Sequence, residues 1–364
     1  MLSTLALSFG LSMVITLALV RGLRASGGAA ADHDFSGPQK FHARAVPRIG
    51  GLGIFAGVGM ALLAAAWRSP VSHEQSLLLL LTSLPAFAAG LTEDVTKRVS
   101  PGWRMLALTV SGVLGAELLG ARISHTAIPG LDEIAQLPLG SLLLAAFVVA
   151  GVGNSVNIID GFNGLASMCS VIMLTGVAAV AFTVGDPWIG SIALTVVAAV
   201  AGFFVWNYPM GLIFLGDGGA YFLGFMLAEL SILLLARNPD VSPLFPLLLC
   251  GYPVVETVFS MYRRKVVRGR PVGMPDGVHL HSLIYRRLMR WAIGSRDAQI
   301  LTRRNSMTAP YLWAICSLSA IPAVVWWDDT RMLALCLVLF AAGYVSVYWR
   351  IVKFRTPRWL VLRR

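Results

Sequence analysis

Apolar residues gather in eleven runs separated by shorter polar stretches. A helix needs about 20 mainly apolar residues to cross the hydrocarbon core of a bilayer. The pattern therefore predicts an all-α integral membrane protein, a polytopic bundle of about eleven transmembrane helices. The runs lie near residues 2–20, 49–67, 76–91, 105–121, 138–152, 165–184, 188–206, 220–236, 243–262, 310–326 and 332–349.

Composition supports a membrane protein. Hydrophobic residues make up 57% of the 364 and charged residues 13%, with a mean hydropathy of +0.74. These values lie far outside the range of soluble globular proteins. No soluble domain, low-complexity tract or internal repeat stands out, so we expect one transmembrane domain over residues 1–364. Its polar loops would lie near 21–48, 92–104, 153–164, 207–219 and 263–309.

The basic residues predict the orientation, because cytoplasmic loops carry the excess of Lys and Arg. Of the 29 Lys and Arg residues, all but Arg68, Arg122, Arg237 and Arg331 fall on one side. The N-terminus is therefore expected outside and the C-terminus in the cytoplasm. This topology and contact with anionic lipids are enough to explain the net charge of +11, so a nucleic-acid partner is not expected.

Five loops carry nearly all the reactive side chains, and the parity of the helices places all five on the cytoplasmic side. They are residues 40–51, 93–97, 154–165, 214–217 and 276–281. Carboxylates, amides, cations and imidazoles gathered on one side of a membrane indicate a metal-dependent active site at the water boundary.

Asp217 stands between glycines before the eighth run. A carboxylate there could hold Mg²⁺ and leave its other positions to water and diphosphate oxygens. It could equally cap the helix that follows. The neighbouring Phe214 is more often a core residue than a ring that stacks on a base, unless a nucleotide is independently implied.

The stretch 154–165 presents amides and a carboxylate. If it were helical, Asn157, Asp160 and Asn163 would share one face. Asn157 could then add a carbonyl oxygen to the metal, with Asp160 supplying charge or holding the ligands in place. A turn rich in Asn, Asp and Gly is the alternative.

Acidic and basic residues in the first two loops could act on phosphate. Glu93 and Asp94 could serve as general base or metal support, or could form a solvated helix end with Lys97 and Arg98. In the loop from 40 to 51, the cations Lys40 and Arg48 could receive phosphate.

The fifth loop contains His279 and His281, followed by Arg286 and Arg287. Two histidines in a basic loop are often merely exposed, but beside a diphosphate they become plausible donors. An amphipathic helix is expected around 282–291. The four cysteines lack the spacing of metal ligands and fall inside apolar runs, so a zinc site is not expected.

Together the five loops, from Lys40 to about Arg287, resemble the polyprenyl-phosphate N-acetylhexosamine-1-phosphate transferase family, glycosyltransferase family 4. The resemblance implies transfer of N-acetylhexosamine 1-phosphate from a UDP-sugar to undecaprenyl phosphate, with release of UMP. It further implies the first membrane step of O-antigen or another cell-envelope polysaccharide, in the bacterial inner membrane with the site facing the cytoplasm. The sugar would be N-acetylglucosamine or a related N-acetylhexosamine.

The resemblance also implies roles for individual residues. The metal, Mg²⁺ with Mn²⁺ as a substitute, would be held by Asp217 and Asn157, and the catalytic candidates are Glu93, Asp94 and Asp160. Substrate contacts are expected from Lys40, Arg48, Lys97, Asn154, Asn163, Phe214, His279, His281 and Arg286. Three residues depart from the family pattern: Glu93 and Asn163 stand where Asp is frequent, and Ser282 interrupts a fuller histidine run.

Two alternatives stay open. One is the related phospho-N-acetylmuramoyl-pentapeptide transferase of peptidoglycan synthesis, although Ser282 departs from its pattern. The other is a secondary transporter of an anionic solute, which should carry polar residues near the midplane of the membrane. Only Glu117, Glu229 and Glu256 lie inside apolar runs. A homodimer is an oligomeric state that the sequence leaves open.

Overall fold

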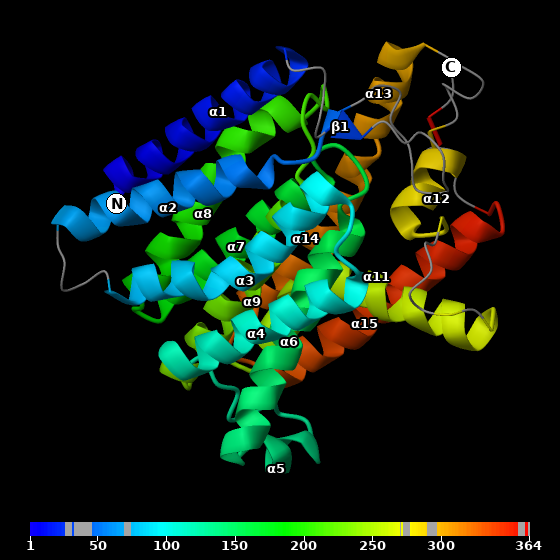
Figure 1. Ribbon diagram of the computed structural model, residues 1–364. Coiled ribbons are helices and arrows are strands. Elements are labelled where there is room, and N and C mark those ends of the chain that lie inside the picture. The colour runs from blue at the N-terminus through cyan, green and yellow to red at the C-terminus, as the bar shows by residue number, and fades with distance from the viewer. Residues whose placement is uncertain are drawn as a thin grey trace.

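The computed structural model describes residues 1–25, 31–32, 46–68, 74–269, 271, 277–289, 297–355 and 361–362. Within these residues the chain is almost entirely helical (Figure 1). In the described part of the chain the one sheet is a two-stranded antiparallel pair of β1 (Ala31–Asp32) and β2 (Val46–Pro47). The prediction of an all-α, polytopic membrane protein is confirmed.

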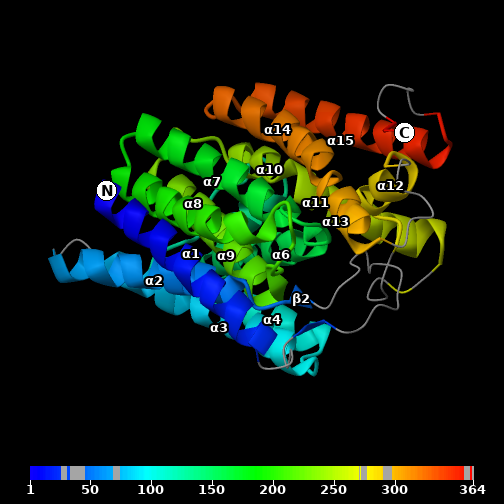
Figure 2. The same cartoon turned by 90° about the horizontal axis from the view of Figure 1, so that it is seen from above.

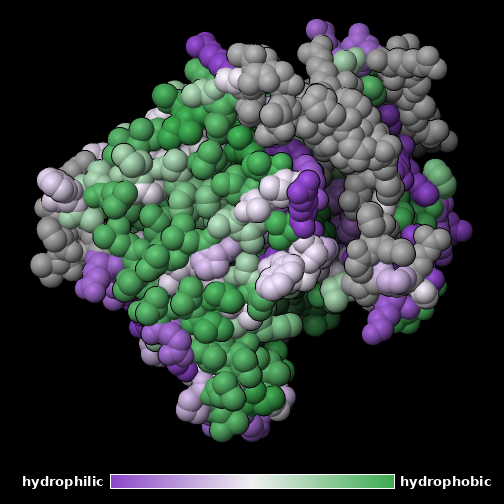
Figure 3. Space-filling model, viewed as in Figure 1, coloured by the Kyte–Doolittle hydropathy of each residue, from purple (hydrophilic) through white to green (hydrophobic). Residues whose placement is uncertain are grey.

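Eight helices of the described part are long and apolar enough to cross a membrane. These spans include α1 (Leu2–Ala25), α3 (Glu74–Thr96), α6 (Pro138–Ile159), α7 (Leu165–Thr183), α8 (Pro187–Asn207), α9 (Gly216–Arg237) and α15 (Thr330–Val352), and the eighth joins α13 (Ala298–Ser306) to α14 (Ala309–Val325). Hydrophobic side chains cover much of the face seen in Figure 3.

The other three predicted spans are helical but shorter or broken. They correspond to α2 (Gly51–Arg68), α4 (Pro101–Leu118) and the pair α10 (Leu244–Leu249) and α11 (Gly251–Tyr262). Pro253 explains the break, because it has no N–H to donate to the carbonyl of Leu249 and its ring crowds that carbonyl. The count of eleven transmembrane helices and the orientation of the termini stay predictions.

Short helices outside these runs lie near the ends of the bundle. α5 (Leu131–Ala135) projects at the bottom of Figure 1. A π-helical turn, η2 (Arg263–Val267), continues α11. The expected amphipathic helix near 282–291 is present as α12 (Leu280–Arg287).

α9 is the central helix, and every residue from Gly216 to Leu234 is buried. Figure 2 shows α14 and α15 along one side of the bundle and α1 to α4 along the other, with α6 and α9 between them. The backbones of α6 and α9 come close at Gly153 and Gly224, where a Cβ on Gly224 would overlap Gly153. Small residues permit such close helix contacts within a membrane.

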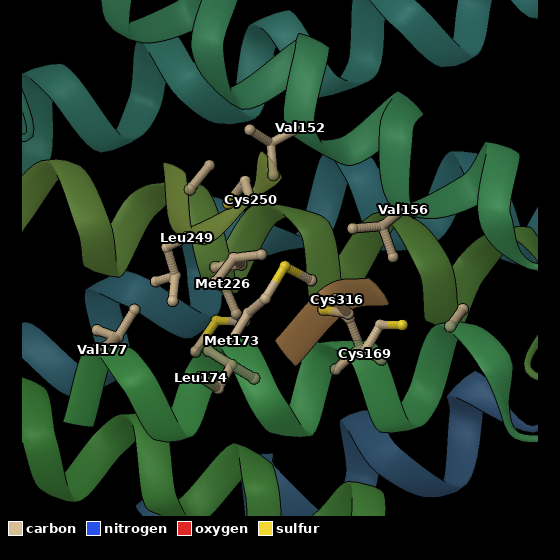
Figure 4. Packing of buried hydrophobic residues seen from close by; sticks show 14 of the residues in the cluster. Val152, Val156, Cys169, Met173, Leu174, Val177, Met226, Leu249, Cys250 and Cys316 are labelled. Atoms are coloured by element: carbon tan, nitrogen blue, oxygen red, sulfur yellow. The ribbon is translucent and has the colours of Figure 1, made fainter. Parts of the chain in front are cut away.

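Side chains from several helices fill the core beside α9. Val156 of α6, Met173 of α7, Met226 of α9 and Cys316 of α14 meet there (Figure 4). Cys169, Cys250 and Cys316 are buried and free, so these thiols pack in the core as small apolar side chains. This packing fixes α9 against α6 and so fixes the relative positions of the polar groups at their ends.

Candidate active site

The carboxylate of Asp217, in the first turn of α9, is contacted by side chains from three other segments of the chain. Asn157 of α6 donates its amide N–H to Oδ1 of Asp217 at 2.9 Å. Arg48 lies 3.6 Å from the same oxygen, and Arg104 of α4 forms an ion pair with Oδ2. The sequence left open whether Asp217 caps α9, and the structure answers this: the N-cap is Leu215, and the Asp217 carboxylate pairs with Asn157, Arg48 and Arg104.

The first backbone amides of α9 are held by Asp94 of α3, which accepts from the N–H groups of Asp217 and Gly218, both at 2.9 Å. The N–H of Gly216 acts on the carboxyl of Asp160 and lowers its pKa. The first amides of a helix have no partner within the helix and attract negative charge. Asp94 occupies two of these amides, so those two are not open to a substrate phosphate.

Two glycines make this close arrangement possible. Gly216 has a φ of +76°, and a Cβ there would overlap the carbonyl oxygen of Arg48. Such a conformation is open to glycine and strained for other residues. A Cβ on Gly90 of α3 would overlap the backbone of Asp217 and Gly218. Both glycines therefore let α3, α9 and the loop at 48 touch.

Arg48 reaches the site because its loop pairs with the segment before α9. Phe214 donates its N–H to the carbonyl of Pro47 at 2.8 Å, and Gly50 donates to the carbonyl of Phe214 at 2.9 Å. The side chain of Phe214 is partly buried. Lys40, the other cation predicted in this loop, lies outside the described residues.

Arg104 is a site residue that the sequence analysis missed, since it was counted only as a charge of the loop 92–104. α4 begins earlier than the apolar run does, at Pro101, with Ser100 as its N-cap. Ser at the N-cap and Pro at the first helical position are a recognisable helix start. That signal would have placed Arg104 in the first turn of a helix.

Glu93 and Asp94 have different surroundings although they are adjacent. Asp94 is 1% exposed and holds the start of α9. Glu93 is partly exposed and accepts the N–H of Val99 at 2.8 Å, which supports the turn after α3. Lys97 lies in that turn with a φ of +58° and is exposed. This geometry gives Asp94 the task of holding the start of α9, while a role for Glu93 as base stays a prediction.

The amide-rich stretch is helical only in its first half. α6 continues to Ile159, past the predicted end at 152, so Asn154 and Asn157 lie on its last turns. Asp160 is the C-cap, and the chain then turns. The condition for one helical face shared by Asn157, Asp160 and Asn163 is therefore not met, and the alternative, a turn, holds from Asp160 onward.

Asn163 forms hydrogen bonds with the end of α13. Its backbone N–H donates to the side chain of Asn305 at 2.9 Å, and its amide donates to the hydroxyl of Ser306 at 3.1 Å. The side chain is 4% exposed. Asn163 thus joins the turn after α6 to α13, and its predicted contact with substrate has no support in this geometry.

Burial raises the pKa of the Asp160 carboxyl to about 7. The nearby charges of Asp217 and Asp94 raise it further, whereas Arg48 and the N–H of Gly216 oppose the shift. Three carboxylates close together disfavour one another's charge, and an added cation favours it.

His279 and His281 are 4% and 3% exposed, so they are not merely solvated loop residues. Their rings stack, with centroids 5.2 Å apart. The ring of His281 also meets that of Phe162 at 5.4 Å and lies beside Gly161, next to Asp160. The structure therefore brings the histidine pair to the same turn that carries Asp160. Arg286, at the end of α12, is exposed.

The residues around Asp217 offer oxygen donors. Within the described residues no three His, Cys, Asp or Glu side chains gather closely enough to hold a metal ion by themselves. Mg²⁺ is commonly held by one or two carboxylates, with waters and substrate phosphates completing its shell. Asp217 and the carbonyl oxygen of Asn157 fit that mode, and a zinc site would need a different donor set.

A family model described as glycosyl transferase family 4 matches residues 76–235. The probable undecaprenyl-phosphate N-acetylglucosaminyl 1-phosphate transferase of Bacillus subtilis (strain 168) is 27% identical over 310 residues, which cover 85% of this chain and 81% of the relative. The phospho-N-acetylmuramoyl-pentapeptide-transferase of Clostridium botulinum (strain Alaska E43 / Type E3) is 31% identical over 272 residues, 71% of this chain and 79% of the relative. The chain belongs to glycosyl transferase family 4.

Proposed function

We propose that this protein transfers N-acetylhexosamine 1-phosphate from a UDP-sugar to undecaprenyl phosphate. In this reaction an oxygen of the lipid phosphate attacks the β-phosphorus of the UDP-sugar. The bond from that phosphorus to the bridging oxygen breaks, and UMP leaves with the electron pair. The product is undecaprenyl diphosphate linked to the sugar.

The observation that carries the proposal is the set of charges around Asp217. A buried carboxylate with Arg48, Arg104 and Asn157 on its oxygens forms a polar centre at the ends of apolar helices. Arginine suits phosphate because its planar group can donate two parallel hydrogen bonds. Arg48 is 30% exposed in its side chain, which lets it reach a diphosphate arriving from the water.

We propose that Asp217 and Asn157 hold Mg²⁺ when the substrate binds. The metal would neutralise charge on the diphosphate and polarise its oxygens. Asp94 keeps the first turn of α9 in place by its two hydrogen bonds, and so keeps the Asp217 carboxylate in position. With Mg²⁺ on Asp217, Arg48 and Arg104 could bind phosphate oxygens.

The family resemblance and the names of the relatives favour N-acetylglucosamine as the sugar, with an O-antigen or other envelope polysaccharide as the product pathway. We place the protein in the bacterial inner membrane with the site on the cytoplasmic side, on the distribution of Lys and Arg. UDP-N-acetylmuramoyl-pentapeptide is a second candidate donor, since a relative at 31% identity carries that name.

The test uses purified protein with Mg²⁺ and undecaprenyl phosphate, to which UDP-N-acetylglucosamine, other UDP-N-acetylhexosamines and UDP-N-acetylmuramoyl-pentapeptide are added separately. UMP release that requires the lipid supports the proposed reaction, and the best donor names the sugar. Release from the pentapeptide donor alone would select the second candidate. Absence of UMP with every donor, together with solute uptake into proteoliposomes, would favour a transporter.

A further inference from the structure

Glu256 of α11 is a further buried carboxylate, and it lies at the histidine end of the site. Its exposed fraction is 0%, and it accepts three hydrogen bonds. Nδ1 of His279 lies 2.9 Å from Oε1, while the N–H of Leu280 and the hydroxyl of Tyr344 donate to Oε2 at 3.1 and 2.5 Å. A buried carboxylate needs such compensation, because an unpaired one is strongly destabilised. From the sequence, Glu256 was noted only as one of three glutamates inside apolar runs.

The contact with Glu256 determines which nitrogen of His279 carries hydrogen. When Glu256 is ionised, its carboxylate can only accept hydrogen bonds, and Nδ1 of His279 is then the donor. Nε2 is then the nitrogen left to act on another group, as an acceptor in the neutral ring or as a donor in the cation. Carboxylates fix histidine tautomer and ring orientation in the same way at many functional sites.

His279 is connected through His281 to the turn that follows Asp160. The His279 ring stacks on that of His281 with an angle of 15° between their planes. His281 in turn adjoins Gly161 and Phe162, which directly follow Asp160. A change in the Glu256 side chain would therefore tilt both imidazoles and disturb their approach to Asp160.

The last helix of the chain secures this arrangement from outside the region that the family model matches. Tyr344 and Tyr348 of α15 donate their hydroxyls to Glu256 and to the carbonyl of Val278. Arg287 donates to the carbonyl of Ile351 near the end of α15 at 2.8 Å. α15 thus contacts the chain both before and after the two histidines, at Val278 and at Arg287.

We propose that Glu256 is a positioning residue for the transfer reaction: it holds His279 through Nδ1, and Tyr344 of α15 holds Glu256. The role in turnover rests on the proposed function. The hydrogen-bond arrangement does not, and it can be measured in protein without substrate.

The chain offers matched controls for both residues. Glu229 of α9 is also a fully buried glutamate, but neither of its carboxylate oxygens has a hydrogen-bond partner within the described residues. Tyr252 of α11 is a fully buried tyrosine whose hydroxyl likewise lacks a partner there. Glu229→Gln and Tyr252→Phe therefore repeat the chemical changes of Glu256→Gln and Tyr344→Phe without touching His279.

The kinetic test measures UMP release, KM for both substrates and thermal unfolding for these four variants. Loss of a carboxylate behind a functional histidine typically costs about 10–100-fold in activity. We expect that loss in kcat for Glu256→Gln, a smaller loss for Tyr344→Phe, and turnover near wild type for both controls. The double variant Glu256→Gln/His279→Ala should be no slower than His279→Ala alone, because Glu256 acts through His279.

Two kinetic results would overturn the proposal. One is wild-type turnover in folded Glu256→Gln protein; the other is a double variant whose loss equals the product of the two single losses. If Glu256→Gln does not fold, Tyr344→Phe is compared with Tyr252→Phe instead. Equal turnover of these two variants contradicts the proposal that Tyr344 and Glu256 position His279.

A spectroscopic test separates this inference from the proposed function. In protein with ¹⁵N-labelled histidine, the signal lost in His279→Ala should show hydrogen on Nδ1. A neutral ring with hydrogen on Nε2 alone would overturn the arrangement. If no UDP-sugar releases UMP, the proposed function fails while this measurement still decides whether Glu256 holds His279.

Discussion

Replacing Asp94 by asparagine tests how the start of α9 is held. The two carboxylate oxygens of Asp94 each accept one backbone N–H, from Asp217 and from Gly218, at 2.9 Å. Asparagine has one acceptor oxygen, and its NH₂ group would face the second N–H. The substitution therefore removes one charge-assisted hydrogen bond and leaves one buried N–H without a partner.

The expected cost follows from these contacts. A lost hydrogen bond to a charged group and the unsatisfied donor that it leaves are together worth about 3 kcal/mol. The lost attraction between the negative charge and the N-terminus of α9 adds up to about 1 kcal/mol. We expect Asp94→Asn to lower the free energy of unfolding by about 3–4 kcal/mol. A displacement of Asp217 by about 1 Å should also reduce kcat about 100-fold.

The assay is reversible unfolding in mixed detergent micelles, paired with UMP release by the same samples. Glu93→Gln is the control for stability, because glutamine can still accept the single N–H of Val99, and its cost should stay below about 1 kcal/mol. Wild-type stability of Asp94→Asn would refute the reasoning. So would a large loss of rate without loss of stability, which would make Asp94 a participant in the chemistry and not a support for α9.

Three further predictions follow from the site. Glu93→Gln should lose about 100- to 10,000-fold in rate if Glu93 is a general base, and Glu93→Asp should lose less; retained activity of the Gln variant at pH 8 would remove that role. Asn163→Ala should lower the unfolding temperature while KM for both substrates stays near wild type, since its partners are Asn305 and Ser306; a raised KM for the UDP-sugar would restore its predicted substrate contact. His281→Ala should raise KM for the UDP-sugar and leave KM for undecaprenyl phosphate unchanged; the reverse pattern would assign it to the lipid phosphate.

The helices were predictable because the membrane imposes long apolar runs, and their parity correctly brought the loops of Arg48, Asp94, Asn157 and Asp217 together. Ends were less predictable. α6 runs beyond 152 because its last turns are buried against protein and not lipid, so polar residues there still form helix. The apolar pattern alone cannot distinguish a polar helical turn that is buried in protein from a loop.

Contacts between residues that lie far apart in the chain could not be predicted from the sequence either. The motif at Glu93 and Asp94 suggested two carboxylates in one role, but only the packing of α3 on α9 shows that Asp94 holds backbone amides. Glu256 and Tyr344 lie in apolar runs 88 residues apart, and nothing in either run indicates that they meet. Arg104 could not be singled out, because the side predicted to be cytoplasmic carries a general excess of Lys and Arg.

The most direct test of the proposed activity is UMP release by wild-type protein and by Asp217→Asn, measured across a Mg²⁺ titration with undecaprenyl phosphate and the best UDP-N-acetylhexosamine. We expect wild-type release to require the lipid and Mg²⁺. Asp217→Asn should insert and fold normally yet lose at least about 100-fold in rate, because its weakened metal binding leaves the diphosphate charge uncompensated. Near-normal turnover of Asp217→Asn at limiting Mg²⁺ would contradict the account.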